Sequence, residues 1–508
     1  MNSEEEKYMN ISKAKQQIRN AVRAYLTRDD LGNYVVPVEK QRPILLIGPP
    51  GIGKTAIMEQ LASELGIGLI SYSMTHHTRQ SAIGLPFISR RTYAGREYDV
   101  TEYTMSEIIA SVYDLMEKTG VKEGILFLDE INCVSETLSP LMLQFLQYKV
   151  FGGHRIPDGW IIVTAGNPPE YNESAREFDP VTLDRLKKID VEPDYEAWKE
   201  YAVSAGMHPA VLAFLNSKRN CFYSVETTVD GRSIVTPRGW EDLSRMLILY
   251  EQNELDVDED LIVQYLQNKK TAREFAVYYD LYCKYRSEYP VDDILSGGIT
   301  DEAAARASEA GFDEVYTLIG LLISNVTADT RNRLEEYRVL ESLRSCIRKF
   351  GADVTAGAKP SECMADIISR LASGREAGIK ARTLSREESD RILRTVSVLE
   401  EISGKISDRQ DEEDNFAMIR DEYSDRVDVH RAKSDETRAR LSNLFRFAER
   451  CWGDGNEMLM IVTELTADPD TTAFISKYGC DEYFAHNKNL LFNEREIEIN
   501  QQIEELGL

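Results

Sequence analysis

The sequence has few of the residues that build metal centres and disulfide frameworks. It contains six histidines in 508 residues, and the adjacent pair at 76 and 77 has no further His or Cys at ligand spacing. Its seven cysteines lie far apart, are odd in number and include no CxxC pair, which is the pattern of reduced thiols. A metal centre built on His and Cys and a disulfide-stabilised fold are therefore not expected.

Long apolar runs and positive charge are also scarce. No segment approaches the ~20 apolar residues of a membrane span, and the acidic first residues, Met1 to Glu6, lack an apolar signal segment. Lys and Arg number 60 against 86 Asp and Glu, so the net charge is -26 and a broad nucleic-acid surface is not expected, although a local basic pore stays open. We expect a cytoplasmic protein without membrane insertion, and we do not expect nucleic acid as a partner.

The chain does contain material for several folded domains. Its 508 residues exceed what one hydrophobic core usually supports, so two to four domains are expected. Hydrophobic residues make up 42% and charged residues 29% of the chain, and its 25 tyrosines argue against wholesale disorder.

The glycine-rich stretch from 48 to 55 is the most informative part of the sequence. It reads Gly-Pro-Pro-Gly-Ile-Gly-Lys-Thr, after an apolar run at 44–47 that predicts a buried strand and before a segment at 56–65 that predicts a helix. In this context backbone N–H groups turn around an anion, Lys54 reaches the β and γ phosphates of a nucleotide, and the Thr55 hydroxyl ligates magnesium. The alternative is a glycine-rich turn without a ligand. The residues expected to contact the nucleotide are Gly48, Pro49, Pro50, Gly51, Ile52, Gly53, Lys54, Thr55 and Ala56.

A second apolar run, residues 124–128, ends in two carboxylates, Asp129 and Glu130. Buried parallel strands deliver side chains to the ligand crevice at their carboxyl ends. Asp129 is therefore expected to hold magnesium, and Glu130 to orient and deprotonate an attacking water. An apolar run that ends in two carboxylates is common and indicates little alone. It supports a nucleotide site here because it follows a phosphate-binding loop in the same chain.

Three further polar side chains are candidates for the same chemistry. Asn167 follows a third apolar strand, predicted over 160–164, and its amide can bond the γ phosphate or the water; the alternative is a turn-forming Asn before Pro168. Two predicted helices near 180 and 237 present Arg185 and Arg238. Each arginine alone would be an ordinary surface residue.

Two segments predict hairpins. Residues 87–103 contain two strand-like runs around Ala94 and Gly95, although a plain surface loop is an equal alternative. Residues 149–156 carry a Gly-Gly turn. Ahead of the phosphate loop, residues 11–26 have apolar side chains at helical spacing, so a helix is expected there that packs on the nucleotide-binding domain.

Taken in this order, the motifs resemble those of the AAA+ ATPases. Residues 48–55 match the Walker A motif, residues 125–130 Walker B, Asn167 sensor 1, Arg185 the arginine finger and Arg238 sensor 2. The resemblance implies a P-loop NTPase α/β core, a parallel sheet flanked by helices, followed by an α-helical lid. It also implies ATP and Mg²⁺ as cofactors and a homo-oligomeric ring, a hexamer, in which Arg185 reaches the γ phosphate held by a neighbouring subunit.

Within that superfamily, residues 79–86 and the two predicted hairpins resemble the MoxR group. The usual Asp-Arg-Phe at the finger is here Asp184-Arg185-Leu186, a conservative departure. The resemblance implies partner proteins with a von Willebrand factor A domain, which such ATPases are thought to mature. The metal-site motif of those domains, Asp-x-Ser-x-Ser, does not occur here, so the partner would be a separate polypeptide.

The second half of the chain predicts helices and no catalytic constellation. Helical periodicity covers 197–205, 209–216, 239–250 and 260–285, and then 311–325, 331–350, 362–373, 385–407, 438–452 and 456–466. Ser296-Gly297-Gly298 marks a candidate boundary, and the polar tail at 493–506 carries an apolar stripe. We predict a nucleotide-binding core with its N-terminal helix over 1–191, a helical lid over 192–295 and an all-α partner-docking region over 296–508. For that last region, a stabilising appendage is the alternative.

Three functional hypotheses follow. The leading one is a ring-forming ATPase that remodels or matures protein partners in a chaperone-like manner. The second is a nucleic-acid motor of a restriction-type system, with GTP as an alternative fuel; the net charge and the lack of a DNA-reading module stand against it. The third is a nucleotide-switched scaffold whose ring assembles with ATP.

Overall fold

The computed structural model describes residues 8–172, 174–228, 231–406 and 412–487. The tail predicted over 493–506 lies outside these residues. The chain divides into two compact units, one of residues 1–197 with 369–393, the other of residues 198–368 with 394–508. We describe each unit by itself.

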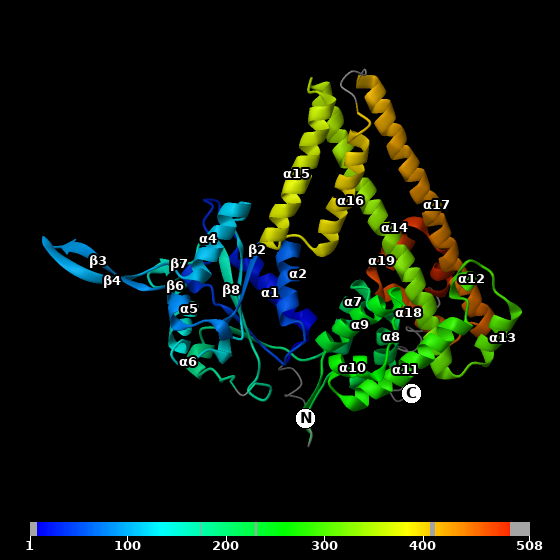
Figure 1. The fold of residues 1–508 in the computed structure, drawn as a ribbon, viewed down its shortest axis with the longest axis horizontal. Helices are drawn as coiled ribbons and strands as arrows, with labels where there is room; N and C mark the ends of the chain where they lie inside the picture. Colours follow the sequence, from blue (N-terminus) through cyan, green and yellow to red (C-terminus); the bar gives the residue numbers. More distant parts are fainter. Residues whose placement is uncertain (1–7, 173, 229–230, 407–411, 488–508) are drawn as a thin grey trace, which may run out of the picture. The chain divides into compact units, whose positions relative to one another are not determined.

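The first unit is built on a five-stranded parallel sheet in the order β2-β5-β8-β1-β9 (Figure 1). β5 and β8 are buried along both faces, except at the carboxyl end of β5, and this explains why their sequences are continuous apolar runs rather than alternating ones. The expected α/β core, a parallel sheet flanked by helices, is confirmed. The strands are β1 (Ile44–Ile47), β2 (Gly68–Ser73), β5 (Gly124–Asp129), β8 (Trp160–Gly166) and β9 (Lys187–Asp190).

The described α-helices that lie wholly within this unit are α1 (Ile11–Tyr25), α2 (Lys54–Leu65), α3 (Arg79–Ile83), α4 (Glu107–Thr119), α5 (Ser139–Tyr148) and α6 (Pro180–Leu183). α1 begins at Asn10, whose side chain accepts a hydrogen bond from the Lys13 N–H at 2.9 Å, an N-cap that satisfies one of the free donors of the first turn. α1 packs on α2, and Lys15 forms a 2.6 Å ion pair with Glu64 across the contact. The helix predicted ahead of the phosphate loop is confirmed.

Both predicted hairpins form. β3 (Pro86–Tyr93) and β4 (Arg96–Tyr103) pair along their whole length and project from the rest of the first unit (Figure 1). Their two-residue turn places Ala94 and Gly95 at φ values of 49° and 77°, the left-handed pair that a type I′ hairpin turn requires. The surface-loop alternative is therefore wrong. β6 (Val150–Phe151) and β7 (His154–Arg155) form the shorter hairpin.

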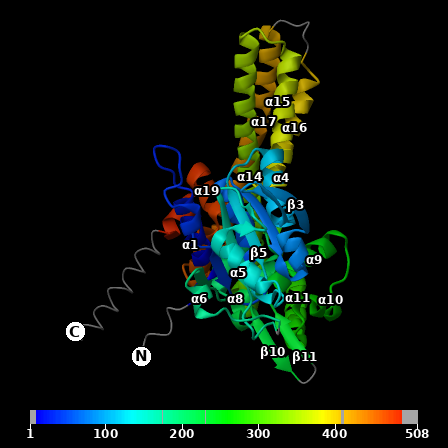
Figure 2. The same ribbon diagram turned by 90° about the vertical axis from the view of Figure 1, so that its left-hand side faces the viewer.

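The second unit is largely helical, as expected for the chain beyond the core. Its helices are α7 (Tyr195–Ser204, which begins in the first unit), α8 (Pro209–Ser217), α9 (Pro237–Gln252), α10 (Glu259–Leu266), α11 (Lys269–Glu288), α12 (Val291–Leu295), α13 (Asp301–Glu309), α14 (Phe312–Thr355), α15 (Pro360–Ala381), α16 (Arg386–Ser403), α17 (Glu412–Trp452), α18 (Asn456–Ala467) and α19 (Pro469–Tyr478). Residues 369–393 of α15 and α16 belong to the first unit. α14 and α17 pack side by side (Figure 2).

Several predicted boundaries in this unit were wrong. The single helix expected over 260–285 is two helices, because Gln267 takes a left-handed conformation and Asn268 caps the second helix through the Thr271 N–H. The separate helices expected over 311–325 and 331–350 are one helix, α14, of 44 residues. A hairpin of β10 (Ser224–Thr228) and β11 (Gly231–Val235) was not predicted.

One hydrophobic core of the second unit joins segments on both sides of the candidate boundary at 296–298. It includes Tyr289 and Leu295 before it, and Leu318, Leu444 and Ile461 after it. The three-domain division stays a prediction, and the packing of this core does not separate a lid from a C-terminal region. Among the described residues, no helix has both the length and the apolar character that crossing a bilayer requires.

Lys149 is a buried lysine in the first unit. It follows α5 with a left-handed φ of 57°, is 2% exposed, and its ammonium donates to Gln41 Oε1 at 3.3 Å. Burial, aided by the positive charge of Arg155, lowers the pKa of Lys149 to about 8. The folded state therefore binds this proton less tightly than the unfolded chain does, and the charge opposes folding below that pKa.

We expect Lys149→Met to stabilise the protein at pH 7 by about 3 kcal/mol, because the pKa falls from 10.5 to about 8 and a tenfold change in proton affinity corresponds to about 1.4 kcal/mol. Since the pKa is lowered in the fold, the destabilisation is present below pH 8 and is relieved as the pH rises toward the unfolded value. Thermal unfolding of both proteins from pH 7 to 10 measures this. The difference in unfolding temperature between Lys149→Met and the parent should shrink as the pH rises, whereas exposed Lys122→Met should show no such trend. A difference that does not depend on pH would contradict the lowered pKa of Lys149.

Candidate nucleotide-binding site

The loop between β1 and α2 follows a path that only glycine permits at two positions. A Cβ on Gly48 would lie 2.6 Å from the Val191 carbonyl oxygen, so no larger residue fits there. Gly53 has a φ of 94° and is the N-cap of α2, a conformation that other residues rarely adopt. The loop thus turns directly into the amino end of a 12-residue helix, where backbone N–H groups and the helix dipole favour an anion.

Lys54 connects this loop with the end of β8. Its side chain is 8% exposed, and its ammonium donates to the carbonyl oxygens of Gly48 and Pro49, both at 2.7 Å, and to Asn167 Oδ1 at 2.9 Å. A phosphate oxygen entering the loop would compete for these bonds. The structure therefore brings together two of the predicted site residues, Lys54 and Asn167.

Thr55 of α2 and Asp129 of β5 also contact each other through their side chains. The Thr55 hydroxyl donates to Asp129 Oδ2 at 3.0 Å, and Asp129 Oδ1 accepts the Glu130 N–H at 2.9 Å. A hydroxyl beside a carboxylate supplies the oxygen ligands that Mg²⁺ prefers. In the described part of the chain, no three His, Cys, Asp or Glu residues gather as a metal site, so Mg²⁺ held here would also need oxygens from phosphate and water.

Glu130 is held by hydroxyl groups from the end of the neighbouring strand and from the turn after it. Its Oε2 accepts hydrogen bonds from Ser73 Oγ at 2.7 Å and from Thr75 Oγ1 at 3.0 Å. Ser73 ends β2 and pairs with Asp129 in the parallel register, which explains why it reaches the residue after β5. Glu130 has a left-handed φ of 56°, an uncommon conformation for a residue other than glycine.

Asn132 is a site residue that the sequence did not reveal. It is 5% exposed, and its amide nitrogen donates to the Asn167 carbonyl at 2.8 Å. Its Oδ1 lies so close to Gly166 that a Cβ on that glycine would meet it at 2.4 Å. Asn132 therefore fixes the end of β8, and with it the residue that contacts Lys54. Nothing in the local pattern around Asn132 distinguishes it from an ordinary loop asparagine.

Cys133 lies beside these groups without the character of a nucleophile. Burial, together with the nearby charges of Glu130 and Asp129, raises the pKa of the Cys133 thiol. The Asn172 amide donates to its sulfur at 3.2 Å. A protonated, half-buried thiol agrees with a packing role.

Of the two predicted arginines, Arg185 belongs to the same unit as this cluster. Arg185 is exposed after α6, and its Nη1 donates to Gln147 Oε1 on α5 at 2.7 Å. Arg238 is exposed in the first turn of α9, which Thr236 caps through the Gly239 N–H. Arg238 belongs to the second unit, so its role toward the phosphate loop stays a prediction.

The parallel sheet, the glycine loop leading into α2 and the polar strand ends define a P-loop nucleotide-binding domain. A family model described as "ATPase family associated with various cellular activities (AAA)" matches residues 44–176. Residues 44–176 are therefore similar to the ATPase domain of that family, whose members in general hydrolyse nucleotides.

Two other comparisons add little. No curated protein matches the chain. Among solved structures, a mutant of RuvB from Thermotoga maritima is similar, with 16% identity and a TM-score of 0.29 over 51% of this chain and 69% of that chain. A likeness of this strength carries no argument about the present protein.

We expect Asn132→Ala to lower the free energy of unfolding by about 1 kcal/mol, because the partly buried Asn167 carbonyl loses the hydrogen bond from Asn132. It should also weaken nucleotide binding, since Asn167 would no longer be fixed beside Lys54. Denaturant unfolding and titration with a fluorescent ATP analogue measure the two effects. Asn172→Ala, which removes only the contact to Cys133 and a turn bond, is the matched control. Equal behaviour of the two variants would contradict the positioning role of Asn132.

Proposed function

We propose that this protein hydrolyses ATP with the help of Mg²⁺. The observation that supports this most directly is the gathering of Lys54, Thr55, Asp129, Glu130 and Asn167 where the phosphate loop meets the ends of three strands. In the proposed site, the loop from Gly48 to Ala56 encloses the phosphates, and Thr55 with Asp129 holds the metal ion, which would supply charge neutralisation at the phosphates.

Glu130 is the proposed general base for the attacking water. Both hydroxyl bonds from β2 and the segment after it go to Oε2, so we assign Oε1 to the water. Asn167 and Lys54, already bonded to each other, are the proposed partners of the γ phosphate.

Arg185 is proposed to act on the nucleotide of a neighbouring subunit in a homo-oligomeric ring, a hexamer. Its exposure and its bond to Gln147 of α5 support a role at a subunit contact. Arg238 is the proposed second sensor, acting from the lid.

The work of such a ring would be the remodelling or maturation of protein partners, as in the MoxR group. The β3–β4 hairpin supports a protein-contacting role, because Phe87, Ile88, Tyr93 and Tyr98 expose apolar surface on a projecting ribbon. A partner with a von Willebrand factor A domain and a cytoplasmic location remain part of this proposal.

We expect purified Glu130→Gln to bind ATP and Mg²⁺ but not to turn ATP over, because the amide cannot accept the proton of water. Phosphate release at saturating ATP, together with an equilibrium binding measurement, tests this. Glu136→Gln, an exposed glutamate paired with Arg176, is the control and should keep its turnover. Persisting Mg²⁺-dependent hydrolysis by Glu130→Gln would remove Glu130 from its role.

We expect Arg185→Ala to bind ATP normally and to lose turnover by ~10³ to 10⁵, the usual contribution of such an arginine. Mixed with Glu130→Gln subunits, it should regain activity, because the mixed ring pairs an intact carboxylate with an intact arginine. Arg176→Ala, another exposed arginine of this unit, should stay active alone. If no mixing ratio restores phosphate release, action across a subunit interface is refuted.

A further inference from the structure

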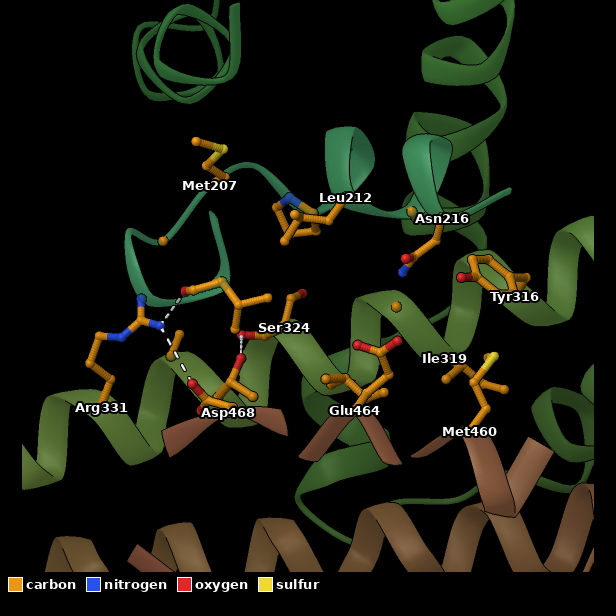
Figure 3. Close-up of a pocket in the computed structure, with 18 residues that line it drawn as sticks. Met207, Leu212, Asn216, Tyr316, Ile319, Ser324, Arg331, Met460, Glu464 and Asp468 are labelled. Atoms are coloured by element: carbon orange, nitrogen blue, oxygen red, sulfur yellow. Dashed lines mark hydrogen bonds and ion pairs between the residues drawn. The ribbon is translucent and has the colours of Figure 1, made fainter. Parts of the chain in front are cut away.

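A pocket of about 280 Å³ lies within the second unit, and none of its lining residues belongs to the candidate nucleotide site (Figure 3). Its wall is formed by the end of α7 and the turn after it, by α8, by α14, by α18 and by the residue that caps α19. Protein interiors are packed almost as densely as organic crystals and keep few voids larger than a water molecule. An empty pocket of this size leaves its wall without the contacts that a close-packed neighbour would supply.

Most of the wall is apolar. Leu212 of α8, Ile323 of α14 and Met460 of α18 line the pocket, and all three side chains are only partly buried. Ile323 and Met460 also pack against the hydrophobic core of this unit, so the pocket borders that core directly. Gly320 contributes no side chain, and the backbone of α14 is therefore part of the wall. A molecule bound here would remove apolar surface from water, which favours binding.

The charged side chains of the wall already have oppositely charged partners. Of the described residues that line the pocket, three are charged: Arg331, Glu464 and Asp468. Glu464 is paired with Lys199 at 2.5 Å, and Arg331 forms ion pairs with Asp468 at 3.9 Å and with Asp470 at 3.3 Å (Figure 3). A cation or an anion that entered the pocket would thus lose its water shell without gaining an unpaired opposite charge.

The hydroxyl groups of the wall do not change this balance. Ser324 donates to the Leu321 carbonyl at 3.0 Å and Thr327 to the Ser324 carbonyl at 3.2 Å, so both hydroxyl protons are used within α14. Burial raises the pKa of Tyr316, so its hydroxyl stays protonated and neutral at pH 7. The wall therefore offers apolar contacts and no unpaired charge.

We propose that this pocket binds an uncharged, mainly apolar molecule of one to two rings, which lies between α8 and α14. A cavity of about 150 Å³ with apolar walls holds benzene, so the larger pocket has room for a second ring and a short substituent. The bound rings would cover the partly buried side chains of Leu212, Ile323 and Met460. Binding here does not depend on ATP hydrolysis, because the pocket shares no residue with the candidate nucleotide site.

The test compares three ligands that share an indole ring and differ in charge: 3-ethylindole, tryptamine and indole-3-acetate. Each is titrated into the full-length protein and followed by ligand-observed NMR and by thermal unfolding. We expect one saturable site for 3-ethylindole, whose binding raises the unfolding temperature, and at least about tenfold weaker binding of the cationic tryptamine and of the anionic indole-3-acetate. Absence of saturable 3-ethylindole binding, or equal affinity for either charged analogue, would overturn the proposal.

Filling the pocket gives an independent test. A Cβ on Gly320 would meet only Ala213 Cβ, at 3.8 Å, so Gly320→Leu begins without a clash and should abolish 3-ethylindole binding by occupying the pocket. Gly374→Leu, at an exposed position of α15 where an added Cβ meets no atom, is the matched control and should bind as the parent does. If Gly320→Leu does not fold, judged by its circular dichroism, Gly320→Val replaces it. Unchanged 3-ethylindole affinity in the folded Gly320 variant would place the ligand elsewhere and refute this site.

Discussion

The parallel pairing of β8 with both β5 and β1 is the interaction on which the candidate site depends. Ile47 lies opposite Gly166, and Leu128 lies opposite Thr164, so three strands end at one edge of the sheet. The residues at and after these strand ends are the phosphate loop, Asp129, Glu130 and Asn167. The strand pairing alone therefore makes them neighbours. The bonds from Lys54 to Asn167 and from Thr55 to Asp129 connect groups that the sheet has already brought together. Because a slip of one residue exchanges the two faces of a strand, the register also decides which side chains face the loop.

The features that could be predicted are those that a short segment determines. The phosphate loop needs glycines at fixed spacing, and the β3–β4 turn needs two left-handed residues, so each has a recognisable pattern in the sequence. Ser73 and Asn132 carry no such pattern, because their importance comes from contacts with Glu130 and Asn167, which follow the ends of other strands. The edge strand β9 was not predicted, for a related reason. Its sequence, Lys-Lys-Ile-Asp, has only one buried residue, Ile189, and the position of the strand is set by its pairing with β1.

The long helix α14 shows the opposite case, in which tertiary packing overrides local preference. Its middle, residues 326–330, is rich in residues with modest helix propensity, and a break is expected there. The structure satisfies these side chains within the helix, since the hydroxyl groups of Thr327 and Thr330 donate to carbonyls three residues earlier. Thr330 is also fully buried and bonds the Thr471 hydroxyl at 3.0 Å. Contacts with α19 therefore stabilise the helix where its own sequence is weakest.

The same packing bears on how the second unit can move. α8 and α11 pack on α14, and Tyr278 of α11 bonds Thr317 of α14 at 3.4 Å. α14 in turn shares a core with α17, α18 and α19 through residues such as Leu318, Leu444 and Phe474. A displacement of α8 would thus carry α14 and its partners with it, rather than stop at the glycine pair near 297.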